Sequence, residues 1–210
     1  MPTTTHAHLW GWGRTNPTVA DTVTVDARGL RAAVKEAGPR GALARGLGRS
    51  YGDAAQNGGG LVLRLASAAG DIVLDSSAAT ATATVGGGVS IDELLRVIVP
   101  RGFFVPVTPG TRFVTIGGAI ASDIHGKNHH VDGSLGNHVT AITMMLADGS
   151  TVVVGPDSRP ELFWATVGGM GLTGVVIDAT IKLLPIETSR MRVDTSRVPD
   201  LDTLLATMSD

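Results

Sequence analysis

The sequence of 210 residues contains no cysteine, and only 4% of it is aromatic and 17% charged. Without cysteine the chain forms no disulfide bond, which is what a reducing compartment permits. The few aromatic residues leave little surface on which nucleobases stack, and the net charge of −2 provides no basic face. We therefore expect no nucleic-acid partner.

Long apolar runs are also missing. No run approaches the roughly 18 apolar residues of a transmembrane helix, and the first residues lack the basic and apolar regions of a signal peptide. The sequence therefore predicts neither a transmembrane segment nor a secretory leader. At 43% hydrophobic residues the chain can bury a sizeable core, as one large domain or as one domain with part of a second.

Glycine is abundant, with 28 residues, and three glycine-rich connections stand out, at 45–60, 110–118 and 168–174. In the first, the glycines of Arg-Gly-Leu-Gly-Arg-Ser-Tyr-Gly (45–52) allow successive backbone N–H groups to point into one concavity. Arg45 and Arg49 add positive charge and Ser50 adds a hydroxyl donor, which favours a phosphate or pyrophosphate. Three or four hydrogen bonds of about 1.5–3 kcal/mol each would anchor a dinucleotide.

The same stretch has two alternative interpretations, a Rossmann fingerprint and a plain surface loop. A Rossmann fingerprint needs a third glycine where Tyr51 stands, and it needs a helix where 56–60 read Gln-Asn-Gly-Gly-Gly. A plain surface loop explains the glycines but not the two arginines and the serine placed among them. A phosphate-binding loop outside the Rossmann class explains the sequence best.

The second connection reads Gly110-Thr-Arg-Phe-Val-Thr-Ile-Gly-Gly and continues into Ala119. Thr115 is a suitable N-cap for a short helix, and Gly117 and Gly118 remove side chains where a ligand would touch the backbone. A buried helix packed closely on a sheet is the alternative; it accounts for the small residues but not for the threonines and Gly110.

Histidines at 125, 129 and 130 raise the question of a metal site. Gly126 and Asn128 interrupt any helix that would bring the histidines to one face, and no Glu or Cys lies near. We expect no metal. Lys127, taken by itself, is most simply a solvated surface charge.

The remaining pattern predicts about nine short strands and three or four helices, hence an α+β domain. Strands are predicted at 22–25, 61–65, 72–75, 80–85, 103–107, 141–146, 151–154 and 175–183, and helices after the N-caps Asp26 and Ser90 and over 160–167. Residues 1–8 read as a disordered tail. Trp10 and Trp12 form either an aromatic wall of a pocket or a cap on the core edge.

Several motifs together closely resemble one family, the FAD-linked oxidases with a flavin domain of the p-cresol methylhydroxylase and vanillyl-alcohol oxidase type. The motifs lie at 45–53, 110–112, 116–119, 123–130 and 163–169, and the similarity extends from about Leu9 to Leu184. The resemblance implies two α+β subdomains that clasp FAD, bound without a covalent link. It also implies an FAD-binding domain at 9–185 and the start of a truncated substrate domain at 186–210.

The resemblance further implies site residues. His125, Lys127 and Tyr51 would lie at the reacting end of the flavin. The cofactor would contact Ala44, Arg45, Gly46, Leu47, Gly48, Arg49, Ser50, Tyr51, Gly52, Asp53, Ala54, Gly110, Thr111, Thr115, Ile116, Gly117, Gly118, Ser122, Asp123, Ile124, His125 and Val176.

Within the family, the resemblance is to members that oxidise the 2′-hydroxyl of decaprenylphosphoryl-β-D-ribose for cell-wall arabinan in actinobacteria. It implies a polyprenyl-phosphate sugar as substrate, a partner reductase that completes the epimerisation, and a cytoplasmic or peripheral envelope location. A sugar or alditol oxidase of the same superfamily, or a truncated FAD-binding module without turnover, are the alternatives. We expect no turnover from these 210 residues alone.

Overall fold

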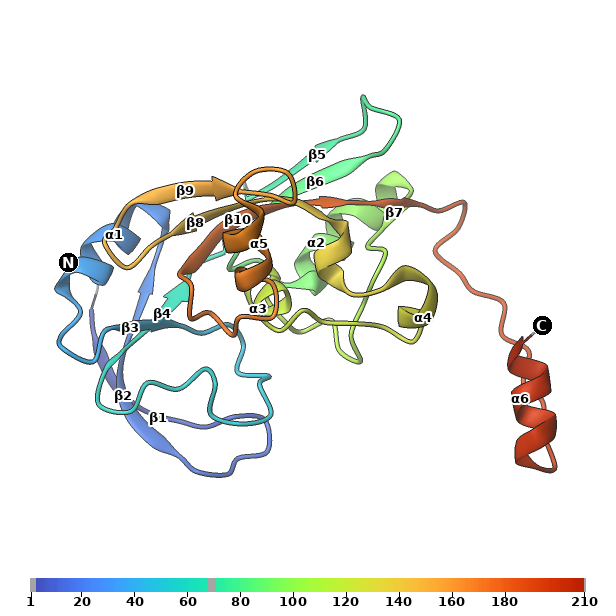
Figure 1. Cartoon of the computed structure of the whole chain (residues 1–210), viewed down its shortest axis with the longest axis horizontal. Helices are drawn as coiled ribbons and strands as arrows, with labels where there is room; N and C mark the ends of the chain where they lie inside the picture. The colour runs from blue at the N-terminus through green and yellow to red at the C-terminus, as the bar shows by residue number, and fades with distance from the viewer. Residues whose placement is uncertain (1–2, 68–70, 210) are drawn as a thin grey trace.

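The computed structural model describes residues 3–67 and 71–209, which form two larger β-sheets, a two-stranded sheet and several helices (Figure 1). The first sheet has the order β1-β2-β4-β3, and the second has the order β5-β6-β10-β8-β9. Helices and strands occur in both halves, so the α+β class is confirmed. Across the described ranges, no helix has the length and apolar character needed to cross a membrane.

The first sheet is built from β1 (Thr5–Leu9), β2 (Thr18–Val25), β3 (Ala42–Ala44) and β4 (Leu61–Leu65). Strands β2 and β3 both run parallel to β4, and helix α1 (Ala27–Glu36) connects β2 to β3. The side chain of Asp26 accepts a hydrogen bond of 2.8 Å from the Gly29 N–H, so the predicted N-cap is confirmed. The helix buries Leu30 and Ala33 against this sheet.

The predicted disordered tail is wrong for residues 5–8. They form most of β1, which pairs antiparallel with β2 in a register that sets Thr5 opposite Thr22 and Leu9 opposite Thr18. The polar residues His6 and His8 made the segment look like a solvated tail, but they alternate with inward-facing residues, as in a half-buried strand. Leu9 is buried in a small cluster with Ala20 and Val62. Residues 1–2 of the expected tail lie outside the described residues.

The second sheet is antiparallel throughout and carries the main core. Its strands are β5 (Ile72–Asp75), β6 (Thr82–Gly86), β8 (Val139–Met145), β9 (Thr151–Val154) and β10 (Val175–Lys182). Helices α2 (Ile91–Ile98), α3 (Ile116–Ala121) and α5 (Pro160–Thr166) contribute to the same core, which contains the fully buried Phe163. Ser90 and Glu93 form the predicted capping box at the start of α2.

The strand predicted at 103–107 is formed only at its first two residues. Only Phe103–Phe104 (β7) pairs, with β11 (Leu184–Pro185), although 103–107 was predicted. Val105 and Val107 are buried as the alternation indicates, but Pro106 lies between them and has no N–H to donate to a ladder. Apolar alternation here reports burial without strand pairing.

The histidine-rich segment contains one short helical turn. This turn, α4 (His129–Asp132), begins after Asn128, so His125 lies outside it and the predicted interruption at Gly126 and Asn128 is observed. A 3₁₀ turn, η2 (Leu135–His138), leads from it to β8, and another, η1 (Val99–Arg101), extends α2.

A shared core joins the two sheets. Met145 of β8 and Val175 of β10 pack with Val23, Leu63 and α1 of the first sheet. The chain leaves the second sheet after β10, passes through β11 and reaches α6 (Leu201–Ser209), which lies apart from the two larger sheets in Figure 1. The assignment of 186–210 to a second domain stays a prediction.

Candidate functional site

The loop that follows β3 presents a run of unpaired backbone donors. Among the hydrogen bonds of the described residues, none has the N–H of Gly46, Gly52 or any residue between them as its donor. Gly48 has φ +70°, the left-handed region that glycine favours. Seven successive N–H groups without a partner in the protein are available to an anion, which fits the predicted concavity.

Arg45 holds this loop from inside. Its guanidinium donates to the carbonyl of Ala55 at 2.8 Å and to the carbonyl of Trp10 at 2.7 Å. Burial lowers the pKa of Arg45, and the charge of Arg64 lowers it further. A methyl group at Gly48 would lie 2.6 Å from this guanidinium, so the loop folds directly over it. The sequence suggested that both arginines serve the anion, but Arg45 is engaged by carbonyls of the protein itself.

Arg49 is the outward cation of the loop. Its guanidinium lies 4.9 Å from the centre of the Trp12 ring, and its side chain is exposed. Such a cation–π contact is worth about 0.5–1 kcal/mol at an exposed site. A guanidinium so weakly held is free to reorient toward a phosphate, which keeps the prediction for Arg49 open.

The tryptophan segment lies along the same loop. The Trp12 N–H donates to the Ser50 carbonyl at 2.7 Å, and a methyl group at Gly11 would lie 2.8 Å from that oxygen. Trp12 is 58% exposed, and Trp10 is partly exposed. Of the two readings left open by the sequence, a wall beside the loop therefore fits better than a cap on the core.

The second glycine-rich element meets the first loop at Thr115. A methyl group at Gly46 would overlap Oγ1 of Thr115 and lie 3.3 Å from its Cγ2. Thr115 is buried and accepts a hydrogen bond of 3.1 Å from the Gly118 N–H, so the predicted N-cap of α3 is confirmed. The end of β3 and the start of α3 consequently lie side by side, as Figure 1 also shows.

Gly87 completes this floor, and sequence reasoning missed it. The Gly117 N–H donates to the Gly87 carbonyl at 2.9 Å, and the Gly87 N–H donates to the Ile177 carbonyl at 2.7 Å. A methyl group at Gly87 would overlap the carbonyl oxygen of Val176. The run of three glycines at 86–88 was interpreted only as a strand end, although it carries the signal for a close backbone approach.

The third glycine-rich connection packs on the other end of α3. The Gly168 N–H donates to the Ile120 carbonyl at 3.0 Å and the Met170 N–H to the Ala121 carbonyl at 2.8 Å. Ser122, a predicted contact residue, is exposed at this end and is the C-cap of α3.

Asp123 faces inward rather than toward an open site. Its Oδ2 accepts from the Ser134 hydroxyl at 2.7 Å, and its Oδ1 accepts from the Gly136 N–H at 2.9 Å. Its φ of +41° lies in the left-handed region. The Asp123 carboxylate is thus held by two hydrogen bonds within the protein, and a cofactor contact of this residue stays a prediction.

The three residues predicted for the reacting end are all exposed. Tyr51 is 85% exposed on the first loop, while His125 and Lys127 lie on the segment after α3. In the part of the chain that the structure describes, no hydrogen bond or ion pair holds these side chains. The His125 ring contacts the His129 ring edge-on, with 5.2 Å between centroids. Within the same described part, no group of three or more potential ligands is placed to hold a metal.

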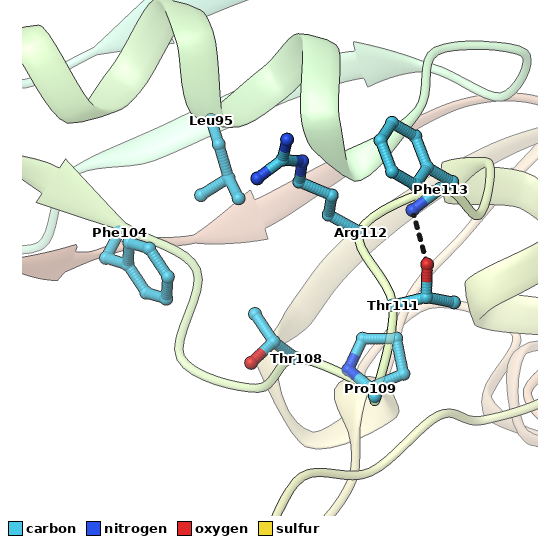
Figure 2. Close-up of a pocket in the computed structure, with 8 residues that line it drawn as sticks. Leu95, Phe104, Thr108, Pro109, Thr111, Arg112 and Phe113 are labelled. Carbon is cyan, nitrogen blue, oxygen red and sulfur yellow. Dashed lines mark hydrogen bonds between the residues drawn. The ribbon is translucent and has the colours of Figure 1, made fainter.

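Gly110 and Thr111 belong to a separate hollow of about 500 Å³, shown in Figure 2. Its apolar wall includes Leu95 and Phe104, and the Thr111 hydroxyl accepts a hydrogen bond of 3.2 Å from the Phe113 N–H. Its cation, Arg112, is paired with Asp92 at 2.6 Å and lies over the Phe113 ring. None of its lining residues comes from the first loop, and the cofactor contacts of Gly110 and Thr111 stay predictions.

Comparison with known proteins identifies relatives of this arrangement. The family model described as "FAD binding domain" matches residues 24–155. The chain is 49% identical to decaprenylphosphoryl-β-D-ribose oxidase of Mycolicibacterium smegmatis, over all of this chain and 46% of the relative. It is 33% identical to the alditol oxidase of a Streptomyces species, over 69% of this chain and 34% of the relative. It is 27% identical to the D-arabinono-1,4-lactone oxidase of Yarrowia lipolytica, over 50% of this chain and 20% of the relative. The chain thus spans less than half the length of each of these relatives.

Proposed function

Since this chain belongs to the FAD-binding-domain family, we propose that it is the flavin-binding part of an FAD-dependent oxidoreductase that oxidises a secondary alcohol of a sugar. The bound flavin supplies a hydride acceptor, and the residues of this chain supply its binding site. The observation that carries the proposal is the run of unpaired N–H groups at 46–52, placed directly against the glycine floor of α3.

The donors present fit the pyrophosphate of FAD. Seven N–H groups and the exposed Arg49 offer hydrogen bonds to an anion, each worth about 1.5–3 kcal/mol to a charged group. Beside them, Gly46, Gly87 and Gly117 allow no side chain without overlap or close contact, so the floor is bare backbone on which an extended ligand can lie. Val176, which packs at this floor, keeps its predicted role as a contact.

Three exposed side chains suit the alcohol chemistry. Oxidation of an alcohol requires a group that accepts the hydroxyl proton while the carbon loses its hydride. Among the described residues, the side chains of His125, Tyr51 and Lys127 make no hydrogen bond or ion pair, and they are our candidates to border the reacting end. We propose that His125 lies against the flavin without a covalent bond.

The substrate we propose is decaprenylphosphoryl-β-D-ribose, oxidised at its 2′-hydroxyl. Identity of 49% over the whole chain to the oxidase named for this substrate supports it. An alditol oxidase is the second candidate, supported by 33% identity to the Streptomyces enzyme. A lipid-linked substrate would favour a cytoplasmic protein or one held peripherally at the envelope, with a partner reductase consuming the keto product; these are parts of the same proposal.

A charge reversal on the loop tests cofactor binding. Arg49→Glu places a negative charge beside the row of donors, and we expect FAD affinity to fall at least about 100-fold, equivalent to roughly 2.7 kcal/mol. Arg28→Glu, on the exposed face of α1, is the matched control and should leave affinity unchanged. The measurement is titration of flavin fluorescence. Equal losses in both variants would mean that net charge, and not the loop, governs binding.

A further inference from the structure

The segment that carries His125 is fastened on its N-terminal side by Asp123. The carboxylate of Asp123 binds the Ser134 hydroxyl and the Gly136 N–H, at 2.7 and 2.9 Å. Ser134 is also the residue that pairs with His125 in an isolated antiparallel bridge, and the Leu135 N–H donates to the Ile124 carbonyl at 2.9 Å. Asp123 therefore ties the backbone on either side of that bridge together.

On its C-terminal side the same segment is fastened by Asn128. The Asn128 side-chain NH₂ donates to the Pro106 carbonyl at 3.0 Å and to the Asp132 carboxylate at 2.6 Å. A methyl group at Gly126 would lie 2.6 Å from Oδ1 of Asn128 and 2.9 Å from the Thr108 carbonyl. The turn after His125 is thus held against residues 106–108 with no spare room.

His125 itself has no side-chain anchor of this kind. Across the described residues its ring makes no hydrogen bond, and its one ring partner is His129. The His129 Nδ1 lies 3.0 Å from the Gly126 carbonyl, and because a carbonyl only accepts, Nδ1 carries the hydrogen. The position of the His125 ring is therefore set by its own backbone and by His129. Both belong to the segment whose ends are held by Asp123 and Asn128.

We propose that Asp123 and Asn128 are positioning residues that bracket His125 and fix its ring at the flavin. This inference rests on the function proposed above. Asp123 also suits its conformation, because Asp and Asn tolerate the left-handed region better than other side chains with a Cβ. Loss of either side chain frees the His125 segment and leaves the 46–52 loop, on a different element, as it is.

The first measurement uses the protein without cofactor. The imidazole Hε1 signal of His125, assigned with a His125→Gln variant, is followed by NMR in Asp123→Ala and Asn128→Ala. We expect both variants to move or broaden this signal. Asp157→Ala, an exposed turn residue, is the control and should not move it. Asp123→Asn keeps a side chain that tolerates the backbone and one acceptor, so it should show a smaller change and remains informative where Asp123→Ala does not fold.

The second measurement uses the protein with FAD. His125→Gln should shift the visible flavin bands and the midpoint potential, and Asp123→Ala and Asn128→Ala should shift both in the same sense. Adding His125→Gln to Asp123→Ala should produce no shift beyond that of His125→Gln alone.

The outcomes separate the two claims. An unmoved His125 signal in Asp123→Ala or Asp123→Asn and in Asn128→Ala overturns the bracket even if FAD binds. Additive flavin shifts in the double variant overturn it as well, since Asp123 would then act on the flavin by another route. A moved His125 signal in a protein that binds no FAD refutes the proposed function, and with it the positioning of His125 toward a flavin.

Discussion

The contact between Gly46 and Thr115 is where the phosphate loop meets helix α3, and a methyl group tests it directly. Gly46→Ala would drive a Cβ into Oγ1 of Thr115, with Cγ2 and Cβ of that residue at 3.3 and 3.4 Å. Thr115 is only 6% exposed, so it has little room to withdraw. We expect this substitution to strain the junction.

The magnitude follows from two terms. Overpacking a filled site costs about 1–3 kcal/mol. Rotation of Thr115 away from the new methyl breaks its bond to the Gly118 N–H, and loss of a helix N-cap costs about 0.5–2 kcal/mol. The lower entropy of the unfolded Ala chain returns about 0.4–1 kcal/mol. We expect Gly46→Ala to lower the free energy of unfolding by about 2–3 kcal/mol.

A double-mutant cycle isolates the contact. Thr115→Ala alone should cost about 1 kcal/mol, the lost cap. It also removes the atoms that the Gly46 methyl would strike. The double variant should therefore lose about 1–2 kcal/mol less in its free energy of unfolding than the sum of the two single losses. Urea unfolding followed by tryptophan fluorescence measures each corner. Gly38→Ala, where nothing lies within 4 Å of the added methyl, is the control. Losses that add to within about 0.5 kcal/mol would show that the loop and the helix do not touch, and would refute this account of the site.

Two further predictions concern the arginines of the loop and the cap of α2. Without cofactor, Arg45→Ala should lower the free energy of unfolding by about 1–3 kcal/mol, because two carbonyls lose a charged donor. Arg49→Ala should lower it by less than about 1 kcal/mol, because it loses only an exposed cation–π contact. Equal losses in urea titrations would contradict the structural role of Arg45 and the outward role of Arg49. Hydrogen bonds from the Ser90 hydroxyl and N–H lower the pKa of Glu93, so the stability gained from this carboxylate is present above its unfolded pKa and is lost as the pH falls through the lower folded value. Ser90→Ala should therefore cost about 0.5–2 kcal/mol near neutral pH and flatten this part of the acid unfolding profile, and an unchanged profile would argue against the cap.

Features that depend on neighbouring residues were predictable from the sequence. The caps at Asp26, Ser90 and Thr115 are formed as expected, because a side chain and the N–H three residues later meet whenever a helix begins there. The loop at 46–52 was likewise identified from its own glycines, and its donors are free as the concavity requires.

Features that depend on distant residues were not predictable in this way. The partners of Arg45 include the Trp10 carbonyl, 35 residues away, and no local pattern distinguishes that use of an arginine from a phosphate contact. In β10 both Val175 and Val176 are buried, because a register shift between Val176 and Asp178 interrupts the simple alternation that a strand pattern predicts. β1 was missed because its identity as a strand depends on pairing with β2 and on the burial of Leu9, which its polar composition conceals.

The central position of β10 has a consequence for the order in which this fold is made. Strand β6 lies between β5 and β10, so one of its edges stays unpaired until β10 has been synthesised. The hydrogen bond between the Thr84 and Thr180 hydroxyls joins residues that are 96 positions apart in the sequence. At about 5–20 residues per second, translation of that interval takes roughly 5–20 s, during which β6 has β5 beside it and one open edge. Gly87 has no partner on β10 in this period either. We therefore expect the nascent chain to hold an unfinished sheet during this interval, and the site floor to close only after β10 has been synthesised.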